Sequence, residues 1–427
     1  MTDKTYSVAE LEQEFLQDFP ELQGKVTFID TTGKSLKDVK KEFGSVYDTV
    51  VDEIVKQEQK SGHVEDPKSL KKQKRDKIGT PAMYINAGIP FAQSVGPEID
   101  STNLTAPHYI VFGGGHDLTA DKILWRLMID SEGKLFSLLD EKFGDAVKKS
   151  ITQNFPVPKA LQNQNMLQTF FIDHECGHVA SYRHIAWEKI EETYFKNYLE
   201  CIADSYALIR HYQRYGQDSE FGETWSALRT MASVMNGASG HLTSKALDKV
   251  IDLNKKGVLK DMPSQQVLAL ALKIAGDVHL DIDEAYNITK AFKTSHLSSS
   301  FKKASMKVIG NKARRVFNKT AKKLTVDDFV DDFTDRMRNA VLSRANNKNQ
   351  TILEVANIAM KTKSIAVYQV ASDFLKSIDK VWTDIDTGAL DRVRKQVETR
   401  ARKPNKEPKR PVLARYKAKY IQKNLRK

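Results

Sequence analysis

The stretch from His174 to His178 holds residues whose types and spacing suit metal chemistry. Its two histidines are four positions apart, so in a helix they lie on one face, one turn from each other. Both imidazoles can then bind one Zn²⁺ at about 2.0–2.1 Å, and Glu175 beside them can accept a proton from an attacking water. The same pattern also arises by chance, because a histidine on an apolar helix face is often a hydrogen-bonded core residue.

A second acidic segment, Glu200 to Asp204, begins 22 positions after His178. Glu200 offers a third, anionic ligand, and Asp204 places another carboxylate one helical turn further on. This combination of His, Glu, His, Glu and Asp favours a metal site over a set of unrelated core residues. A site that keeps its ligands but has lost its metal is a further alternative, although no ligand position is substituted.

The segments HECGH and ECIAD resemble the gluzincins, zinc metallopeptidases in which HExxH is completed by a glutamate from a following helix. The likeness runs from His174 to Tyr206, and it implies a zincin-like core with Zn²⁺ as cofactor and a peptide or protein substrate. The resemblance implies that His174, His178 and Glu200 are metal ligands and that Glu175 is the general base. It also implies that the Asp204 carboxylate holds a ligand histidine in the correct tautomer.

The residue before Glu200 is Leu199, whereas thermolysin-like gluzincins usually have asparagine at that position. The ExxAD form of this segment is closer to the membrane-associated and minigluzincin-like branches. The resemblance therefore assigns no subfamily.

His241 is the candidate for a further catalytic role. It follows a loop rich in turn-forming residues, 236–240, and precedes Thr243, which is a favourable helix N-cap. Zincin chemistry needs a donor that faces the oxyanion developing on the scissile carbonyl, and a residue downstream of the third ligand usually supplies it. A loop histidine without a role is the alternative, and the competing donors are Arg210, Tyr212 and Tyr215.

Helices are expected at both metal-binding segments. No proline interrupts 166–195, and the second segment lacks proline and glycine until Gly216. Two antiparallel helices joined across 187–194 would bring Glu200 to the histidines. Gly177 costs about 1 kcal/mol in a helix interior, so we expect close approach of another backbone or of substrate there. The apolar stripe of the first helix contains Leu167, Phe170, Phe171, His174, His178, Tyr182 and Ile185.

Other residues near these segments have weaker signals. Cys176 and Cys201 each lie beside a ligand position but point about 100° away around the helix, so we expect small core residues. His184 and His211 are expected at the surface or next to a ligand, and His116 is a weak alternative ligand. The glycines at 113–115 lack the lysine and the spacing of a phosphate-binding loop, which argues against that function.

The fold class expected from these patterns is α+β, predominantly helical. Residues 1–116 form a mixed region that includes an edge strand, and 117–255 form the zincin-like catalytic helical core. Residues 256–390 form an accessory helical region, and 391–427 form a basic flexible tail. Within these regions we expect strands at 25–29, 82–85 and 108–112, the last of them at the edge of the sheet where an extended substrate would pair. We expect helices at 35–60, 246–253, 263–275, 326–346 and 351–378.

Charge is concentrated at one end of the chain. The 427 residues carry a net charge of +12, and the segment 391–427 holds 15 Lys/Arg against 3 Asp/Glu, which accounts for all of it. Three prolines in that segment exclude a continuous helix. Such a tail can bind polyanions, including nucleic acid or an anionic surface, or it can contact a secretion machinery; a solvated tail with no target is the alternative.

Composition gives the expected compartment. No run of 18 apolar residues predicts a transmembrane segment, the N-terminus lacks the pattern of a signal peptide, and two cysteines cannot form a disulfide framework. We expect a cytoplasmic protein, or alternatively an effector secreted without a cleaved signal. The predicted function is zinc-dependent peptide hydrolysis; the alternative is a helical nucleic-acid- or partner-binding protein whose zinc site is structural or vestigial.

Overall fold

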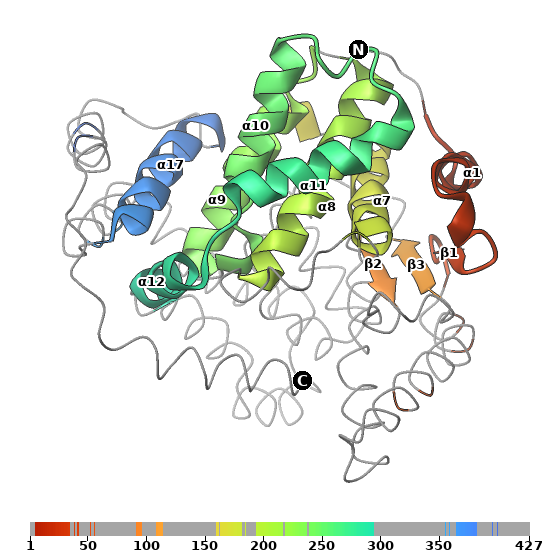
Figure 1. Ribbon diagram of the computed structural model, residues 1–427, viewed down its shortest axis with the longest axis horizontal. Coiled ribbons are helices and arrows are strands. Elements are labelled where there is room, and N and C mark those ends of the chain that lie inside the picture. The colour runs from red at the N-terminus through yellow and green to blue at the C-terminus, as the bar shows by residue number, and fades with distance from the viewer. Residues whose placement is uncertain are drawn as a thin grey trace, which may run out of the picture.

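A computed structural model describes the chain at 5–34, 91–95, 108–113, 159–161, 163–181, 194–216, 218–236, 239–293 and 364–381, together with isolated positions between and beyond these ranges. The described part is mostly helical with one small sheet (Figure 1). This agrees with the α+β, predominantly helical class.

The sheet has three strands in the order β1-β3-β2. Strand β1 (Val26–Asp30) runs parallel to β3 (His108–Gly113), with Phe28 opposite Ile110, and β2 (Phe91–Val95) runs antiparallel to β3. The expected strands at 25–29 and 108–112 are therefore confirmed to within a residue. Strand β2 is not among the strands expected from the sequence.

The expectation that the strand at 108–112 lies at the sheet edge is wrong for the described sheet. β3 lies between the other two strands, and Ile110, Val111 and Phe112 are completely buried. A strand buried on both faces reads as a continuous apolar run, which explains why its sequence gave a strong strand signal. The edge strand that packs on α7 (Gln164–Ser181), the helix that holds His174 and His178, is β2.

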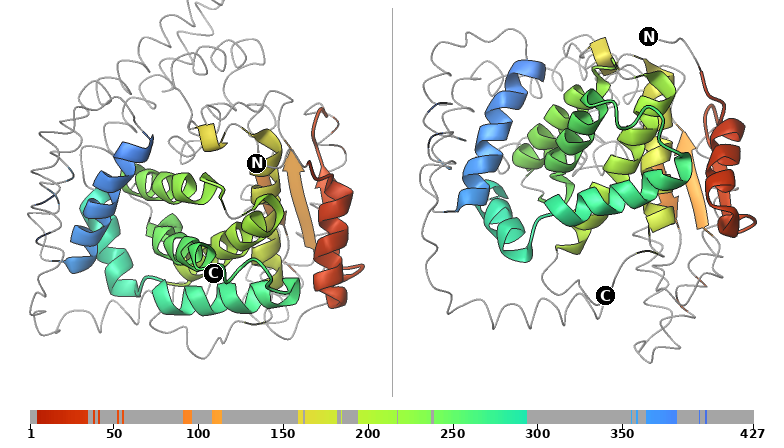
Figure 2. Two further views of the ribbon diagram at one scale, coloured as in Figure 1. Left: turned by 90° about the horizontal axis from the view of Figure 1, so that it is seen from above. Right: turned by 45° about the horizontal axis from the view of Figure 1, so that its top comes forward.

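Helix α1 (Val8–Asp18) covers the other side of the sheet, so that the sheet lies between α1 and α7 (Figure 2). Ser7 begins α1 with a capping box, since its side chain accepts from the Glu10 amide while the Glu10 carboxylate accepts from the Ser7 amide. Leu11 and Phe15 form its buried face. A short 3₁₀ turn, η1 (Pro20–Leu22), leads from α1 into β1.

Helix α8 (Phe195–Tyr215) lies at the centre of the described helices. Helices α7 (Gln164–Ser181), α10 (Ser244–Lys255) and α11 (Val267–Val278) all pack on it, and it is buried on almost every side. Helix α9 (Phe221–Asn236) packs on α10 and on α17 (Ile365–Val381), which in turn contacts α12 (Ile282–Lys293). The remaining described turns are η4 (Lys159–Leu161), η7 (Ser239–His241) and η8 (Ser264–Gln266).

Helices α7 and α8 are antiparallel and in close contact. Tyr215, at the end of α8, hydrogen-bonds Thr169 near the start of α7, whereas Gly177 near the end of α7 faces Ala203. A Cβ atom at Gly177 would lie 2.9 Å from Ala203 Cα and 3.2 Å from Tyr206 Cβ. The expected close approach at Gly177 is therefore to another backbone, that of α8.

An ionic cluster joins α1 to this helix pair. Arg214 of α8 contacts Asp173 of α7, and its Nη2 lies 2.8 Å from Glu14 Oε2 in α1. Arg210 donates to the same Glu14 oxygen at 2.8 Å. The carboxylates compensate both buried guanidinium groups, as buried charges require.

Several other expectations have clear outcomes. The helix at 246–253 is confirmed as α10, and the helix at 263–275 begins at Val267 after a 3₁₀ turn. The expectation of one continuous helix at 351–378 is wrong, because Ser364 is not helical and α17 begins at Ile365. The expected elements at 35–60, 82–85 and 326–346, the histidine at 116 and the tail at 391–427 lie wholly or almost wholly outside the described residues. No helix within the described ranges is long and apolar enough to cross a membrane.

Candidate metal centre

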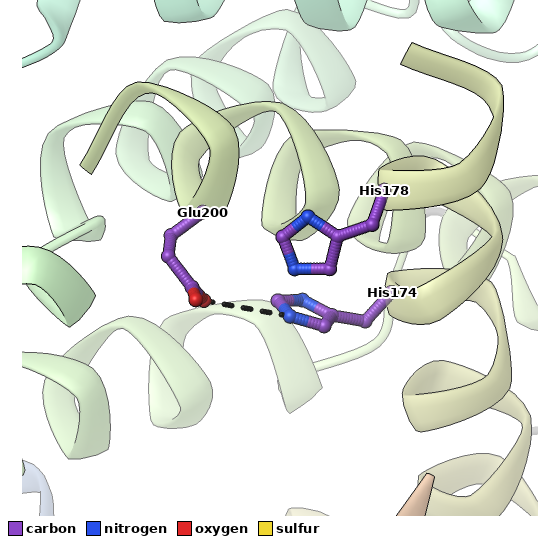
Figure 3. A group of neighbouring side chains, drawn as sticks. All are labelled: His174, His178 and Glu200. Carbon is purple, nitrogen blue, oxygen red and sulfur yellow. Dashed lines mark ion pairs between the residues drawn. The ribbon is translucent and has the colours of Figure 1, made fainter. Parts of the chain in front are cut away.

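Three of the predicted ligands meet between α7 and α8. His174 and His178 extend from one face of α7, and Glu200 extends toward them from α8 (Figure 3). One ligand atom from each residue lies within 4.8 Å of the other two. The two imidazole rings are nearly perpendicular, at 89°, with centroids 4.8 Å apart. This is the only group of its kind among the residues that the structure describes.

Asp204 orients the first histidine. Its Oδ1 lies 2.8 Å from His174 Nδ1, which leaves the other ring nitrogen, Nε2, facing Glu200. Burial alone would lower the pKa of His174, but the Asp204 and Glu200 carboxylates raise it to about 9. Burial and the neighbouring His174 charge lower the pKa of His178.

Asp204 is itself held by two donors that the sequence did not single out. Arg229 of α9 donates from Nη2 to Oδ1 at 2.8 Å, and the Thr243 hydroxyl donates to Oδ2. Although burial acts to raise the pKa of Asp204, the Arg229 and His174 charges hold it well below its usual range. Arg229 lies outside the segment that resembles the gluzincins, and no local sequence pattern predicts its role. It reaches Asp204 because α9 packs on α10 and η7.

Thr243 precedes α10, as expected, but its side chain does not cap the helix. It makes no hydrogen bond to the first-turn amides of α10 and bonds Asp204 instead. A hydroxyl can serve either partner, and here the buried carboxylate takes it.

Glu200 carries the strongest sign that this cluster suits a cation. Its buried Oε2 accepts no hydrogen bond from the described residues, although it forms an ion pair with Arg229 Nη2 at 3.8 Å, and His241 Nδ1 and His174 Nε2 lie 3.4 and 3.5 Å away. Burial would raise the pKa of Glu200, but the facing histidines, with His241 first, hold it well below its usual range. A buried carboxylate oxygen without a donor is costly unless a cation binds it, so the residues present fit a metal ion.

Glu175 projects toward strand β2. Its Oε2 accepts the backbone N–H of Ser94 at 2.6 Å. This bond fixes one carboxylate oxygen of the residue that follows His174. Ser94 was not foreseen, because β2 and α7 are 81 positions apart at this contact.

His241 lies at the same cluster, on η7. Arg229 Nη1 lies 3.2 Å from its Nδ1, and because a guanidinium can only donate, Nδ1 is the acceptor. The proton of the neutral ring is therefore on Nε2. The Glu200 carboxylate acts to raise the pKa of His241, but the partial burial of the ring and the Arg229 and Lys196 charges lower it to about 4. The side chain is 41% exposed, which leaves it accessible to a ligand.

The competing donors have other partners. Arg210 binds Glu14 and the Tyr215 hydroxyl binds Asn165 and Thr169, both at the α1 side of the helix pair, and the Tyr212 ring is buried in the core. His241 is therefore the one of these four candidates that reaches the cluster.

The other histidines and the cysteines have structural surroundings. His184 is exposed, as expected. The expectation for His211 is wrong: the residue is 1% exposed, stacks on Phe221 and lies 2.8 Å from the Ser219 hydroxyl, away from the ligands. Cys176 and Cys201 are buried free thiols, in agreement with small core residues.

Comparison with known protein families, with curated proteins and with solved structures gave no match for this chain. The function is therefore inferred from the geometry and chemistry of the site.

Proposed function

We propose that this protein is a zinc-dependent metallopeptidase. The observation that carries the proposal is the convergence of His174, His178 and Glu200 within 4.8 Å, with Glu175 on the same helix as the histidines. Two histidines and one glutamate are a ligand set found in catalytic zinc sites, where the remaining position is left for water or substrate. Structural zinc sites usually have four protein ligands, and the described cluster has three.

His174, His178 and Glu200 would hold the zinc ion. When bound, zinc lowers the pKa of water and polarises the scissile carbonyl. Asp204 keeps His174 in the tautomer whose Nε2 is free to act as a ligand, because Asp204 accepts the proton on Nδ1. Arg229 and Thr243 keep Asp204 ionised and in place.

Glu175 is the proposed general base. Its carboxylate accepts the proton of the attacking water and passes it to the leaving amine. The Ser94 amide binds one of its oxygens and so restricts the carboxylate to one orientation. His241 is the proposed donor to the developing oxyanion, since its Nε2 carries a proton and its Nδ1 is bound by Arg229.

Strand β2 is the proposed substrate-binding edge. The Ser94 N–H points to Glu175 and not to β3, so this edge of β2 faces the helix that bears the ligands. An extended peptide can add to such an edge through main-chain hydrogen bonds. A peptide bound there would lie beside both Glu175 and the zinc ligands.

The test uses the full chain reconstituted with zinc and the variant Glu175→Gln. The amide fills the same space but cannot accept the proton, so we expect about one zinc per chain and a loss of hydrolysis of about 100-fold or more. Metal analysis gives the zinc content, and mapping of new N-termini in a proteome digest gives both activity and specificity.

Two further variants serve as controls for this test. Glu223→Gln changes an exposed glutamate that pairs with Lys255, and it should behave as wild type. His178→Ala should lose most of the zinc. Full activity of Glu175→Gln contradicts the mechanism, whereas zinc binding by a wild-type protein that cleaves nothing favours a structural or vestigial site in a binding protein.

A further inference from the structure

Asn197 is completely buried on α8, one turn before the ligand Glu200. Its side-chain amide nitrogen lies 3.2, 3.3 and 3.0 Å from the carbonyl oxygens of Ser239, Gly240 and Leu242. These carbonyls surround His241 in the chain. One buried side chain therefore binds the backbone of the segment that carries the proposed oxyanion donor.

The other end of the Asn197 amide binds a second segment. Its Oδ1 accepts the backbone N–H of Leu280 at 2.8 Å, in the connection between α11 and α12. The Cys201 thiol also lies 3.6 Å from this oxygen. Asn197 thus uses its donors for the loop 239–242 and its acceptor for the α11–α12 connection, so both ends of the amide have partners.

We propose that Asn197 is a positioning residue that fixes His241 relative to Glu200, an inference that rests on the proposed function. The segment 239–242 has only a short 3₁₀ turn of its own, η7 (Ser239–His241). Its backbone would be weakly restrained without a buried partner, because such short turns have poor hydrogen-bond geometry. Asn197 ties this turn to the same helix that presents Glu200, so the two residues keep one relative position.

Other contacts of the loop do not replace this restraint. The Ser239 hydroxyl bonds Thr289 of α12 at 2.7 Å, which anchors the loop to a different helix. Arg229 holds the His241 ring but not its backbone. The next residue, Thr243, is tied to α8 through its side chain, which bonds Asp204. Among the described residues, only Asn197 of α8 hydrogen-bonds the backbone of 239–242 itself.

The first test measures amide hydrogen exchange in the metal-free protein and needs no activity. Asn197→Ala should speed exchange at 239–243 and at Leu280, because it removes both the donor and the acceptor. Asn197→Asp should speed exchange at 239–243 while Leu280 stays protected, because a carboxylate still accepts from the Leu280 amide. Unchanged exchange at 239–243 in both variants overturns the proposal.

A control variant lies on the same helix. Tyr215→Phe removes a buried hydroxyl of α8 that bonds Asn165 and Thr169, and it should leave exchange at 239–243 and Leu280 unchanged. If neither Asn197 variant folds, the wild-type protein still decides. A wild-type Leu280 amide that exchanges as fast as an unstructured peptide overturns the proposal, and strong protection supports it.

The second test separates positioning from a general structural role. His241→Ala should lower kcat about 100-fold, as removal of an oxyanion donor does, and Asn197→Ala should lower kcat about 10-fold with KM and zinc content unchanged. The double variant should be no slower than His241→Ala alone. Losses that multiply, or zinc lost with Asn197→Ala, overturn the proposal. An inactive wild type refutes the peptidase function instead, and the exchange experiment then decides the role of Asn197 alone.

Discussion

Asp204 is the residue on which three elements of the site converge. It accepts from His174 of α7, from Arg229 of α9 and from Thr243 just before α10. Two of these donors, His174 and Arg229, bind the same oxygen, Oδ1, whereas Thr243 binds Oδ2. Its ionised form is stabilised by the charges around it, so Asp204 stays a carboxylate over the whole neutral range.

We expect Asp204→Asn to fold and to weaken zinc binding about 10-fold, with Asp204→Ala at the upper end of a 10–100-fold range. The asparagine oxygen can still accept from His174 and Arg229, and its NH₂ can donate to the Thr243 hydroxyl, but the negative charge is gone. Alanine leaves the buried Arg229 without its carboxylate. Competition with a chromogenic chelator gives the affinities, and an unchanged affinity in both variants excludes the proposed role.

For single residues, the sequence predicts those site members whose position follows from local helical spacing. His174, His178, Glu200 and Asp204 belong to two short segments, and helical periodicity alone places each set on one face. Arg229, Ser94 and Thr243 reach the site from other elements, and their roles depend on how those elements pack. A threonine before a helix looks like an N-cap in any sequence, so only the structure shows that Asp204 has taken its hydroxyl.

Among the elements, the contact between α7 and α8 determines whether the ligands meet. The two helices come close at Gly177, which lies one residue before the proposed ligand His178 and faces Ala203, one residue before Asp204. Both helix backbones approach here without an intervening side chain. The separation of the ligand residues therefore depends on the absence of a Cβ atom at Gly177.

Gly177→Ala should lower the melting temperature and weaken zinc binding about 10-fold or more. A gain in helix propensity of about 1 kcal/mol favours alanine, but its Cβ would lie 2.9 Å from the Ala203 backbone and would force the helices apart. Gly276→Ala in α11 is the matched control, since a Cβ there has no neighbour within 4 Å and should raise stability. Equal melting temperatures and zinc affinities of the two variants would show that the close contact at Gly177 does not determine the separation of the ligands.

The strands were harder to place from the sequence than the helices. The apolar run at 108–112 was strong enough to identify β3, but the expected edge position was wrong, because β1 and β2 pair with its two edges. Strand β2, FAQSV, is short and mixed, so it gave little signal. An edge strand often carries polar residues, and these residues weaken the apolar pattern by which a strand is identified.

For the molecule as a whole, buried ionisable groups make stability depend on pH. Burial, together with the Arg214 charge, lowers the pKa of His211 to about 3, whereas an unfolded histidine titrates near 6.5. The unfolded state therefore binds a proton first as the pH falls. Stability from His211 is fully present above about pH 6.5 and is lost progressively down to about pH 3.

His211→Phe should flatten this part of the stability profile. Phenylalanine can keep the stacking on Phe221 but has no proton to bind, so the wild type should lose about 2 kcal/mol more than the variant between pH 7.5 and pH 5. Urea unfolding of the metal-free proteins at several pH values measures the free energy of unfolding of each. The difference between wild type and variant removes the contributions of the other titrating groups. Parallel profiles for wild type and His211→Phe contradict the expectation.

The ionic cluster of Arg214 has a consequence for the order in which the chain can fold. Helix α1 is made first, yet Glu14 finds its partner Arg214 200 residues later. Ribosomes add roughly 5–20 residues per second, so α1 waits on the order of 10–40 s before its partner exists. During that time Phe15 can pack only on nearby rings such as Phe19 and Phe28, because α7 and α8 are not yet complete. The N-terminal helix is thus the earliest helix of the described fold to be synthesised, but its ionic attachment to α8 can form only after that helix is complete, so it stays open to chaperones and proteases during this interval.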